Sequence, residues 1–167
     1  MKKSVAYFLI LCAVNIYMPI FAQDTTEALI LRSEQVKSKY GDKSTQYLAA
    51  VDSVVMHAFI KEQFDLALDY RKKHLSIIDQ IGGNKSIEYA DDLTRIGNII
   101  YRMQPNSPQE VLPYYLQAYS IYEQSDAPKN IMYEYCLGQI SNIYIAQEQY
   151  NDALGFQRLY AEQVKAN

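Results

Sequence analysis

The chain has 167 residues, of which 49 % are hydrophobic and 21 % are charged, and its formal net charge is −3. This balance is that of an ordinary globular protein and argues against a disordered chain. The acidic excess argues against nucleic acid or an anionic membrane surface as a partner, because both attract basic surfaces. Sixteen Tyr, no Trp, six Gly and five Pro favour long packed helices over a turn-rich sheet protein.

Residues 1–22 have the pattern of a bacterial signal peptide. Two lysines precede an apolar run, Val5–Val14, and Ala22 supplies a small residue at the expected cleavage site. An uncleaved membrane anchor is the alternative, although Asn15 and Pro19 interrupt the apolar segment. We therefore expect an exported protein, periplasmic or secreted and free of the membrane after cleavage. Loss of the two lysines would leave 14 basic against 19 acidic residues, a formal charge of −5.

Cleavage also removes Cys12 and leaves Cys136 as the only thiol. A lipid anchor on Cys12 is not expected, because bacterial lipoproteins carry a small residue before that cysteine and this chain has Leu11. An intramolecular disulfide is then impossible, even in an oxidising compartment. We expect Cys136 to be a small buried residue of a helix rather than a reactive thiol.

The mature chain starts with a single predicted helix, Thr25–Tyr40, which Gly41 ends. Three further helices then share one pattern of apolar positions, spaced 0, 4, 7 and 11, which lie on one helical face. The three sets are Tyr47, Val51, Val54 and Ala58, then Tyr89, Leu93, Ile96 and Ile100, then Tyr133, Leu137, Ile140 and Tyr144. The first step is 42 residues and the second is 44.

A second helix follows each of these three. Its repeated positions are Ala67, Leu68 and Tyr70, then Val111, Leu112 and Tyr114, then Ala153, Leu154 and Phe156. Helix pairs with this period predict an all-α solenoid of antiparallel pairs, because no unit can bury its apolar face without a neighbour. We expect one domain, 23–167, with a leading helix and three units at about 44–85, 86–128 and 129–167.

Capping residues mark the expected helix ends. Gly82 and Gly83 end the second helix of the first unit, and Ser86 is suited to cap the next helix. Ser107 to Glu110 has the sequence of a capping box with Pro at the first helical position, which predicts that the following helix starts there. Pro113 would then lie inside that helix.

The third unit resembles the tetratricopeptide consensus, through LGQISNIY at 137–144 and QYNDAL at 149–154, and the second unit carries Ile96-Gly97-Asn98. The 42-residue period, the opening Tyr89 to Leu93 and the interior Pro113 resemble the kinesin-light-chain-type subclass of these repeats. The resemblance covers about residues 25–165 and implies a right-handed α-solenoid that binds proteins. The chain departs from the family at Val55, His74 and Tyr160, where small residues are usual, so we expect the first and third units to pack more loosely or with altered crossing angles.

No constellation for chemistry stands out, so we expect neither an enzyme nor a cofactor or metal. His57 and His74 fall on different helices without metal-ligand spacing, and packing or surface positions are expected for both. Asp91-Asp92 and Glu34 are interpreted as solvated charges of helix surfaces.

The first helices of such solenoids line a concave surface, which predicts a groove for a peptide or protein partner. The repeat register assigns six residues to it: Arg95, Asn98, Tyr101, Arg102, Gln139 and Asn142. In peptide-binding members of the family the Asn at this position bonds the peptide backbone, and Asn98 and Asn142 match it, whereas the first unit has Met56. The alternative is that each Asn bonds within its own repeat.

The last helix carries an apolar stripe of Leu154, Leu159, Tyr160 and Val164 without a further helix to cover it. This stripe predicts self-association or a bound partner at the C-terminal face. The alternative is that the chain is a fragment of a larger exported protein, such as the sensor ectodomain of a signalling receptor or the repeat arm of an enzyme.

Overall fold

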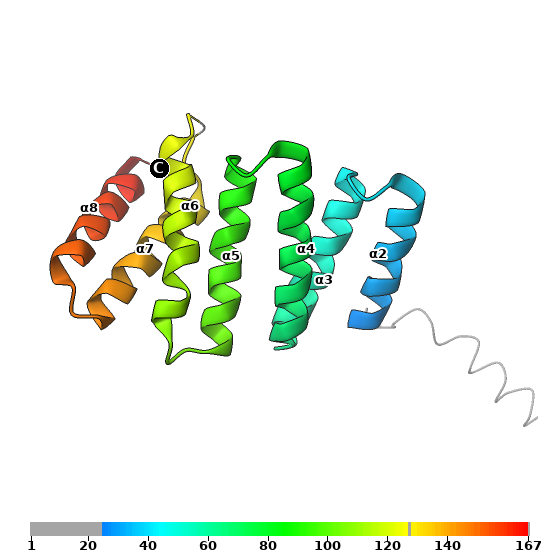
Figure 1. Ribbon diagram of the computed structural model, residues 1–167, viewed down its shortest axis with the longest axis horizontal. Helices are drawn as coiled ribbons and strands as arrows, with labels where there is room; N and C mark the ends of the chain where they lie inside the picture. The colour runs from blue at the N-terminus through cyan, green and yellow to red at the C-terminus, as the bar shows by residue number, and fades with distance from the viewer. Residues whose placement is uncertain (1–24, 127, 167) are drawn as a thin grey trace, which may run out of the picture.

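The computed structural model describes residues 25–126 and 128–166 (Figure 1). Within these ranges the chain forms seven α-helices and one 3-10 turn, Pro108–Glu110, and no strand. The helices are α2 (Thr26–Tyr40), α3 (Thr45–Ile60), α4 (Phe64–Gly82), α5 (Ile87–Met103), α6 (Leu112–Gln124), α7 (Ile131–Ala146) and α8 (Tyr150–Ala166). The predicted all-α solenoid of three helix pairs and a leading helix is confirmed. The expected signal peptide, 1–22, lies outside the described residues.

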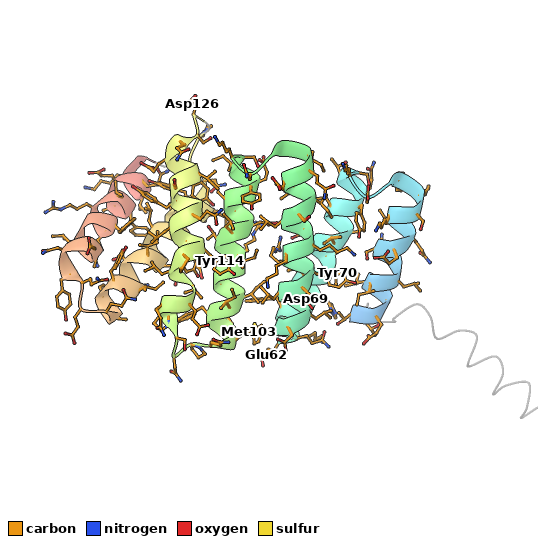
Figure 2. All side chains as sticks on the ribbon, in the orientation of Figure 1. Glu62, Asp69, Tyr70, Met103, Tyr114 and Asp126 are labelled. Carbon is orange, nitrogen blue, oxygen red and sulfur yellow. The ribbon has the colours of Figure 1, made fainter. Side chains whose placement is uncertain are left out.

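The helices stand side by side along the long axis, with α2 and α8 at opposite ends (Figure 1). Each helix packs against the next one in the chain, and α5 also contacts α7. The pairs are α3 with α4, α5 with α6, and α7 with α8, so α3, α5 and α7 are the first helices of successive units. Figure 2 shows that side chains occupy the spaces between neighbouring helices along the whole length.

Side-chain caps start four of the helices. The hydroxyl of Thr25 accepts from the backbone N–H of Ala28, and Ser44 and Ser86 do the same for the residues three positions on. The amide oxygen of Asn130 accepts two backbone N–H groups at the start of α7. Each such cap stabilises a helix by about 1 kcal/mol. The predicted cap at Ser86 is confirmed.

The start of α6 corrects one prediction. The side chain of Ser107 makes no cap bond, the chain turns through a 3-10 segment at Pro108–Glu110, and α6 starts at Leu112. The reason is Pro113, whose ring would clash with the carbonyl four residues earlier if an α-helix ran from Pro108 onward. Pro113 therefore lies in the first turn of α6, where its missing N–H costs little, and the interior position expected for it is wrong.

In the first and third units the same turn joins the first helix to the second. Glu62 and Glu148 both have positive φ, at 58° and 59°. The next backbone N–H in each case bonds the carbonyl five residues earlier, Gln63 to Ala58 and Gln149 to Tyr144, both at 2.9 Å. The same backbone geometry thus returns at the same point of the repeat.

Most positions of the 0-4-7-11 pattern are buried, which confirms the register; Tyr89, Ile100 and Tyr144 are half-buried. Gly97 permits a close contact between α5 and α6, because an added Cβ would lie 2.8 Å from the Tyr115 ring. Cys136 is fully buried and its thiol donates to the backbone carbonyl of Tyr115 at 3.2 Å. Burial raises the pKa of the Cys136 thiol to about 12, in agreement with the expected unreactive position.

Candidate functional site

A cleft of about 250 Å³ opens across the first helices of all three units. Most of the side chains that line it are apolar or aromatic, and the polar ones are two arginines and one asparagine. Its lining residues are Val55, Met56 and Phe59 of α3, Arg71 of α4, Arg95, Asn98 and Ile99 of α5, and Met132 and Tyr135 of α7. We refer to this site as the apolar cleft.

A group of charged side chains lies at the base of the apolar cleft. Arg71, whose side chain is only 1 % exposed, donates to Asp52 at 2.7 Å and to Asp92 at 2.9 Å. The second carboxylate oxygen of Asp92 lies 2.5 Å from Nδ1 of His74, and Arg95 lies 3.8 Å from the first. These five residues form the charge cluster, in which two guanidinium groups balance two carboxylates.

The charge cluster overturns one expectation. Asp92 is fully buried rather than solvated, because it lies on the face of α5 that packs against Arg71 and His74 of α4. Its neighbour Asp91 is half-buried and accepts from the hydroxyl of Tyr122 at 2.7 Å. Val55 and His74, two of the positions at which the chain departs from the family, are both buried as well.

The other two charged or titratable side chains behave as expected. Glu34 is exposed and pairs with Lys73 at 3.2 Å across the surface. His57 is half-buried and shares a hydrogen bond with the hydroxyl of Thr26 at 3.0 Å. The hydrogen bond between His57 and Thr26 joins the leading helix, α2, to α3 of the first unit.

Two of the six predicted groove residues, Arg95 and Asn98, line the apolar cleft. The amide oxygen of Asn98 accepts a hydrogen bond from the hydroxyl of Tyr135 at 2.9 Å. Asn98 therefore bonds a residue of the next unit, which neither interpretation of this position had included. With its acceptor engaged, Asn98 offers a partner chiefly the NH₂ donor of its amide.

Gln139 and Asn142 line a second cleft, of about 360 Å³, between α7 and α8. We call it the polar cleft, because seven of its eight lining residues carry an amide, hydroxyl or carboxyl group. The lining residues are Glu134, Tyr135, Gly138, Gln139, Ser141, Asn142, Gln157 and Tyr160. Since Tyr135 belongs to both linings, the two clefts are neighbours along one surface.

Tyr101 and Arg102 line neither cleft. The Arg102 guanidinium lies over the rings of Phe59 and Phe64, with 5.8 and 5.6 Å to their centroids, and 3.9 Å from the Glu62 carboxylate. Glu62 and Met103 lie along the edge of the molecule where α3 and α5 end, midway along its length (Figure 2). Tyr101 is 38 % exposed on α5. Of the six predicted groove residues, two therefore line the apolar cleft and two line the polar cleft. Tyr101 and Arg102 lie in the last turn of α5.

Comparisons with known proteins bear on the fold. No protein-family model and no curated protein matches the chain. Among solved structures, it is similar to the crystal structure of BtubC (BKLC) from P. vanneervenii, with a TM-score of 0.72 and 13 % identity. The match covers 84 % of this chain and 56 % of BtubC, so the chain spans about half the length of that protein. The fold is a tetratricopeptide-like helical repeat. At this identity the likeness concerns the fold alone.

Several residues of the apolar cleft were missed from the sequence. Tyr135 and Met132 lie near the start of α7, outside the 0-4-7-11 pattern, and at the position of Tyr135 the other units have Ala49 and Asp91. The repeat register identifies one face of each first helix, but the cleft also uses the start of the next first helix. The sequence does contain a signal for Arg71. It aligns with Tyr115 of the second unit, which is buried, so a charged residue at this position indicates a buried charge.

The last helix keeps an uncovered apolar surface within the tetratricopeptide-like repeat. Leu154, Tyr160 and Val164 are each more than 40 % exposed, whereas Leu159 packs against α7. Leu154 and Val164 therefore form the open face of α8, whereas Tyr160 is exposed in the polar cleft beside α7. The counterparts of these three exposed residues in α4 are the half-buried Leu68 and the buried His74 and Ile78, of which His74 bonds Asp92 of α5.

Neither a metal site nor a membrane span is found in the ranges 25–126 and 128–166. No group of three or more His, Cys, Asp or Glu side chains there is placed to hold a metal ion. None of the helices there combines the length and apolarity that crossing a membrane requires.

Proposed function

We propose that this protein is an exported scaffold that binds a peptide or protein segment in the groove formed by α3, α5 and α7. The observation that carries the proposal is the apolar cleft, which crosses the first helices of three units and presents Met56, Phe59 and Met132 beside polar groups. Sites that bind other molecules combine such a concave apolar lining with a few polar groups that fix orientation.

The energetics of the apolar cleft favour recognition of a side chain. Burying one large apolar side chain there would contribute roughly 1.5 to 3 kcal/mol of binding free energy. The unbranched side chains of Met56 and Met132 adapt to different shapes of ligand. Asn98 and Asn142 add amide groups that can bond the backbone of an extended segment.

The state of the ionisable groups supports binding over catalysis. Arg71, Asp92 and His74 are bonded to one another beneath the cleft. A general acid or base must instead present its proton-exchanging atom to a substrate. We therefore propose that the protein does no chemistry of its own.

Two other parts of the proposal concern place and assembly. The lysines and apolar run within residues 1–22 support export to the periplasm or the medium. The open face of α8 supports self-association or a second contact with a partner. The alternative, that this chain belongs to a larger exported protein such as a receptor or an enzyme, stays a prediction.

Affinity capture with paired variants tests the groove. Met56→Asp places a charge in the apolar cleft, and Leu31→Asp changes a similarly exposed apolar residue of α2 away from it. A partner that binds in the groove is retained by the wild type and Leu31→Asp and lost from Met56→Asp. The double variant Asn98→Ala with Asn142→Ala should weaken capture while helicity stays unchanged. A partner retained equally by all variants contradicts groove binding.

Fractionation of the source cells tests export. An antibody against the repeat domain should detect a shortened form, lacking about 22 residues, in the periplasm or medium. A full-length form confined to the cytoplasm would contradict this part of the proposal.

A further inference from the structure

We propose that the apolar cleft binds an apolar side chain of the segment together with a neutral main-chain carbonyl group next to it, and that Nε of Arg71 donates to this carbonyl oxygen. The inference rests on the proposed function and states which groups of the bound segment the cleft recognises. It follows from the hydrogen-bonding groups that the lining residues offer to a ligand.

Arg71 has one nitrogen without a partner. Its two terminal nitrogens bond Asp52 and Asp92 at 2.7 and 2.9 Å, but Nε is buried without a hydrogen bond to any described residue. Arg71 is only 1 % exposed and lines the apolar cleft. A buried donor without an acceptor is unfavourable, so an acceptor brought by a ligand would gain more here than on the open surface.

The other polar residues of the lining add donors rather than acceptors. Asn98 and Tyr135 carry the only side-chain oxygens of the lining, and the Asn98 oxygen already accepts from the Tyr135 hydroxyl at 2.9 Å. The NH₂ group of Asn98 is then the part of this amide that a ligand can bond. The Arg95 guanidinium, which is 42 % exposed, lies 3.8 Å from Asp92, beyond hydrogen-bond distance. A ligand group that fits this lining therefore supplies an acceptor rather than an N–H donor.

The charges around the apolar cleft favour a neutral acceptor over a carboxylate. The guanidinium groups of Arg71 and Arg95 are balanced by the carboxylates of Asp52 and Asp92. A carboxylate of the ligand would add a further negative charge to this group and lose its hydration in a largely apolar cleft. A main-chain carbonyl has no net charge, yet it accepts from a charged donor, which makes a stronger hydrogen bond than a neutral donor does.

Flexible side chains of the lining give a carbonyl group access to Arg71. Nε is buried in the free protein, so a side chain of the lining must move before an acceptor can reach it. Met56 and Met132 both line the cleft, and Met56 is 51 % exposed. Unbranched methionine side chains adapt readily to a ligand, and the apolar side chain of the segment would then pack beside Val55 and Phe59.

Selection from a phage-displayed library of random twelve-residue peptides separates this inference from the proposed function. The displayed peptides are joined to the coat protein at their C-terminus, so they present no free C-terminal carboxylate. Enriched peptides should share an apolar residue and lose binding with Met56→Asp. If no sequence is enriched, or if Met56→Asp binds the peptides as well as the wild type, the proposed function fails and the inference with it. If binding requires an acidic residue of the peptide, the inference alone is overturned.

A thioamide scan of an enriched peptide tests the carbonyl group. Replacing a carbonyl oxygen with sulfur makes that group a weaker acceptor and the adjoining N–H a stronger donor. At a position next to the apolar residue the thioamide should bind about tenfold more weakly, the effect of losing a hydrogen bond to a charged group. Positions outside the cleft should be unaffected. Unchanged or tighter binding at every position would overturn the inference and leave groove binding intact.

Heteronuclear NMR of the wild type identifies the donor, since a variant of Arg71 itself would disrupt the charge cluster. The Nε–H signal of Arg71 should move downfield when the parent peptide binds and should move less with the weakened thioamide peptide. The Nε–H signal of Arg158, on the exposed surface of α8 outside both clefts, is the matched control and should not move. An Arg71 signal that stays in place while the peptide binds overturns the assignment.

Discussion

The junction between α4 and α5 and the junction between α6 and α7 occupy equivalent places in the repeat but differ in chemistry. The first is held by buried charges and the second by aromatic and aliphatic packing. Three aligned positions show the change: Arg71, His74 and Asp92 in the first junction correspond to Tyr115, Ala118 and Cys136 in the second. All six of these residues are buried.

This difference distinguishes the residues that define each helix pair from the residues that join one unit to the next. Both junctions keep the same apolar stripe on the first helix, so the stripe is enough to define the helix pair. The residues between the stripe positions then differ freely between junctions. A buried ion network is strongly destabilised when one member is removed, whereas an apolar junction tolerates changes that preserve volume.

The largest effect is expected from Asp92→Ala. It leaves His74 without this carboxylate and Arg71 with Asp52 alone, so the free energy of unfolding should fall by about 3 to 5 kcal/mol. The control is Cys136→Ala at the aligned position of the second junction, which should cost about 1 kcal/mol. Urea unfolding followed by circular dichroism measures both. Equal losses in the two variants would contradict the contrast between the junctions.

Glycine variants address the packing inside the units. Gly97→Ala forces a methyl group against the Tyr115 ring and should cost about 1 to 3 kcal/mol. Gly138→Ala meets nothing within 4 Å and should stabilise α7 by up to about 1 kcal/mol, because Ala is the better helix former. Thermal unfolding distinguishes the two. A stable Gly97→Ala variant would mean that the ring of Tyr115 moves aside.

Alkaline pH should weaken the apolar junction selectively. The pKa of Cys136 is raised to about 12, so above pH about 8.5 the unfolded chain loses this proton while the folded chain keeps it. The contribution of the Cys136 thiol to the free energy of unfolding is therefore fully present below pH about 8.5. It falls by about 1.4 kcal/mol per pH unit as the pH rises from there toward 12. Burial also raises the pKa values of Tyr115, Tyr122 and Tyr133, which adds to the loss above pH about 10.

The same measurement on Cys136→Ala provides the control for alkaline unfolding. Its stability should stay constant up to pH about 10, where the tyrosines of the unfolded chain begin to ionise. A wild type and a variant with the same pH dependence would show that the buried thiol has no part in it.

The smallest effect on stability is expected from a substitution on the open face of α8, the last helix. Val164 corresponds to the buried Ile78 and Tyr122 of the two junctions but is 47 % exposed. Val164→Ala should change stability by less than about 0.5 kcal/mol, against about 2 to 5 kcal/mol for Ile78→Ala. If the open face mediates self-association, sedimentation of the wild type should depend on concentration and Val164→Asp should remove that dependence. A monomer at all concentrations would exclude self-association.

The fold was predictable because each repeat signals its helices through a regular apolar pattern. The stripe of Tyr133, Leu137 and Ile140 recurs in all three units, and capping residues such as Ser86 mark the helix starts. The start of α6 was missed because a capping-box sequence at Ser107 was given more weight than the steric effect of Pro113.

The candidate site was predictable only in part. The register placed Asn98 and Asn142 on the groove side of their helices, and each lines a cleft. It could not foresee that Tyr135 bonds Asn98, because that contact joins different units and does not recur. Asp92 was taken for a surface charge since its partners, Arg71 and His74, lie 21 and 18 residues earlier in the sequence.

The charge cluster also constrains how such a chain can have grown by duplication. A copy of the first unit inserted after the second would place Arg71 and His74 of the copy against Cys136 of the third unit instead of Asp92, leaving the arginine with one carboxylate. A copy of the second unit inserted after itself would place Asp92 of the copy against Tyr115 and Ala118. Both rearrangements keep the apolar stripes, yet each removes partners from a buried charge: the copied Arg71 loses one of its two carboxylates, and the copied Asp92 loses Arg71 and His74. The chemistry of these junctions thus makes the order of the units matter for stability, although the apolar stripes alone would allow either rearrangement.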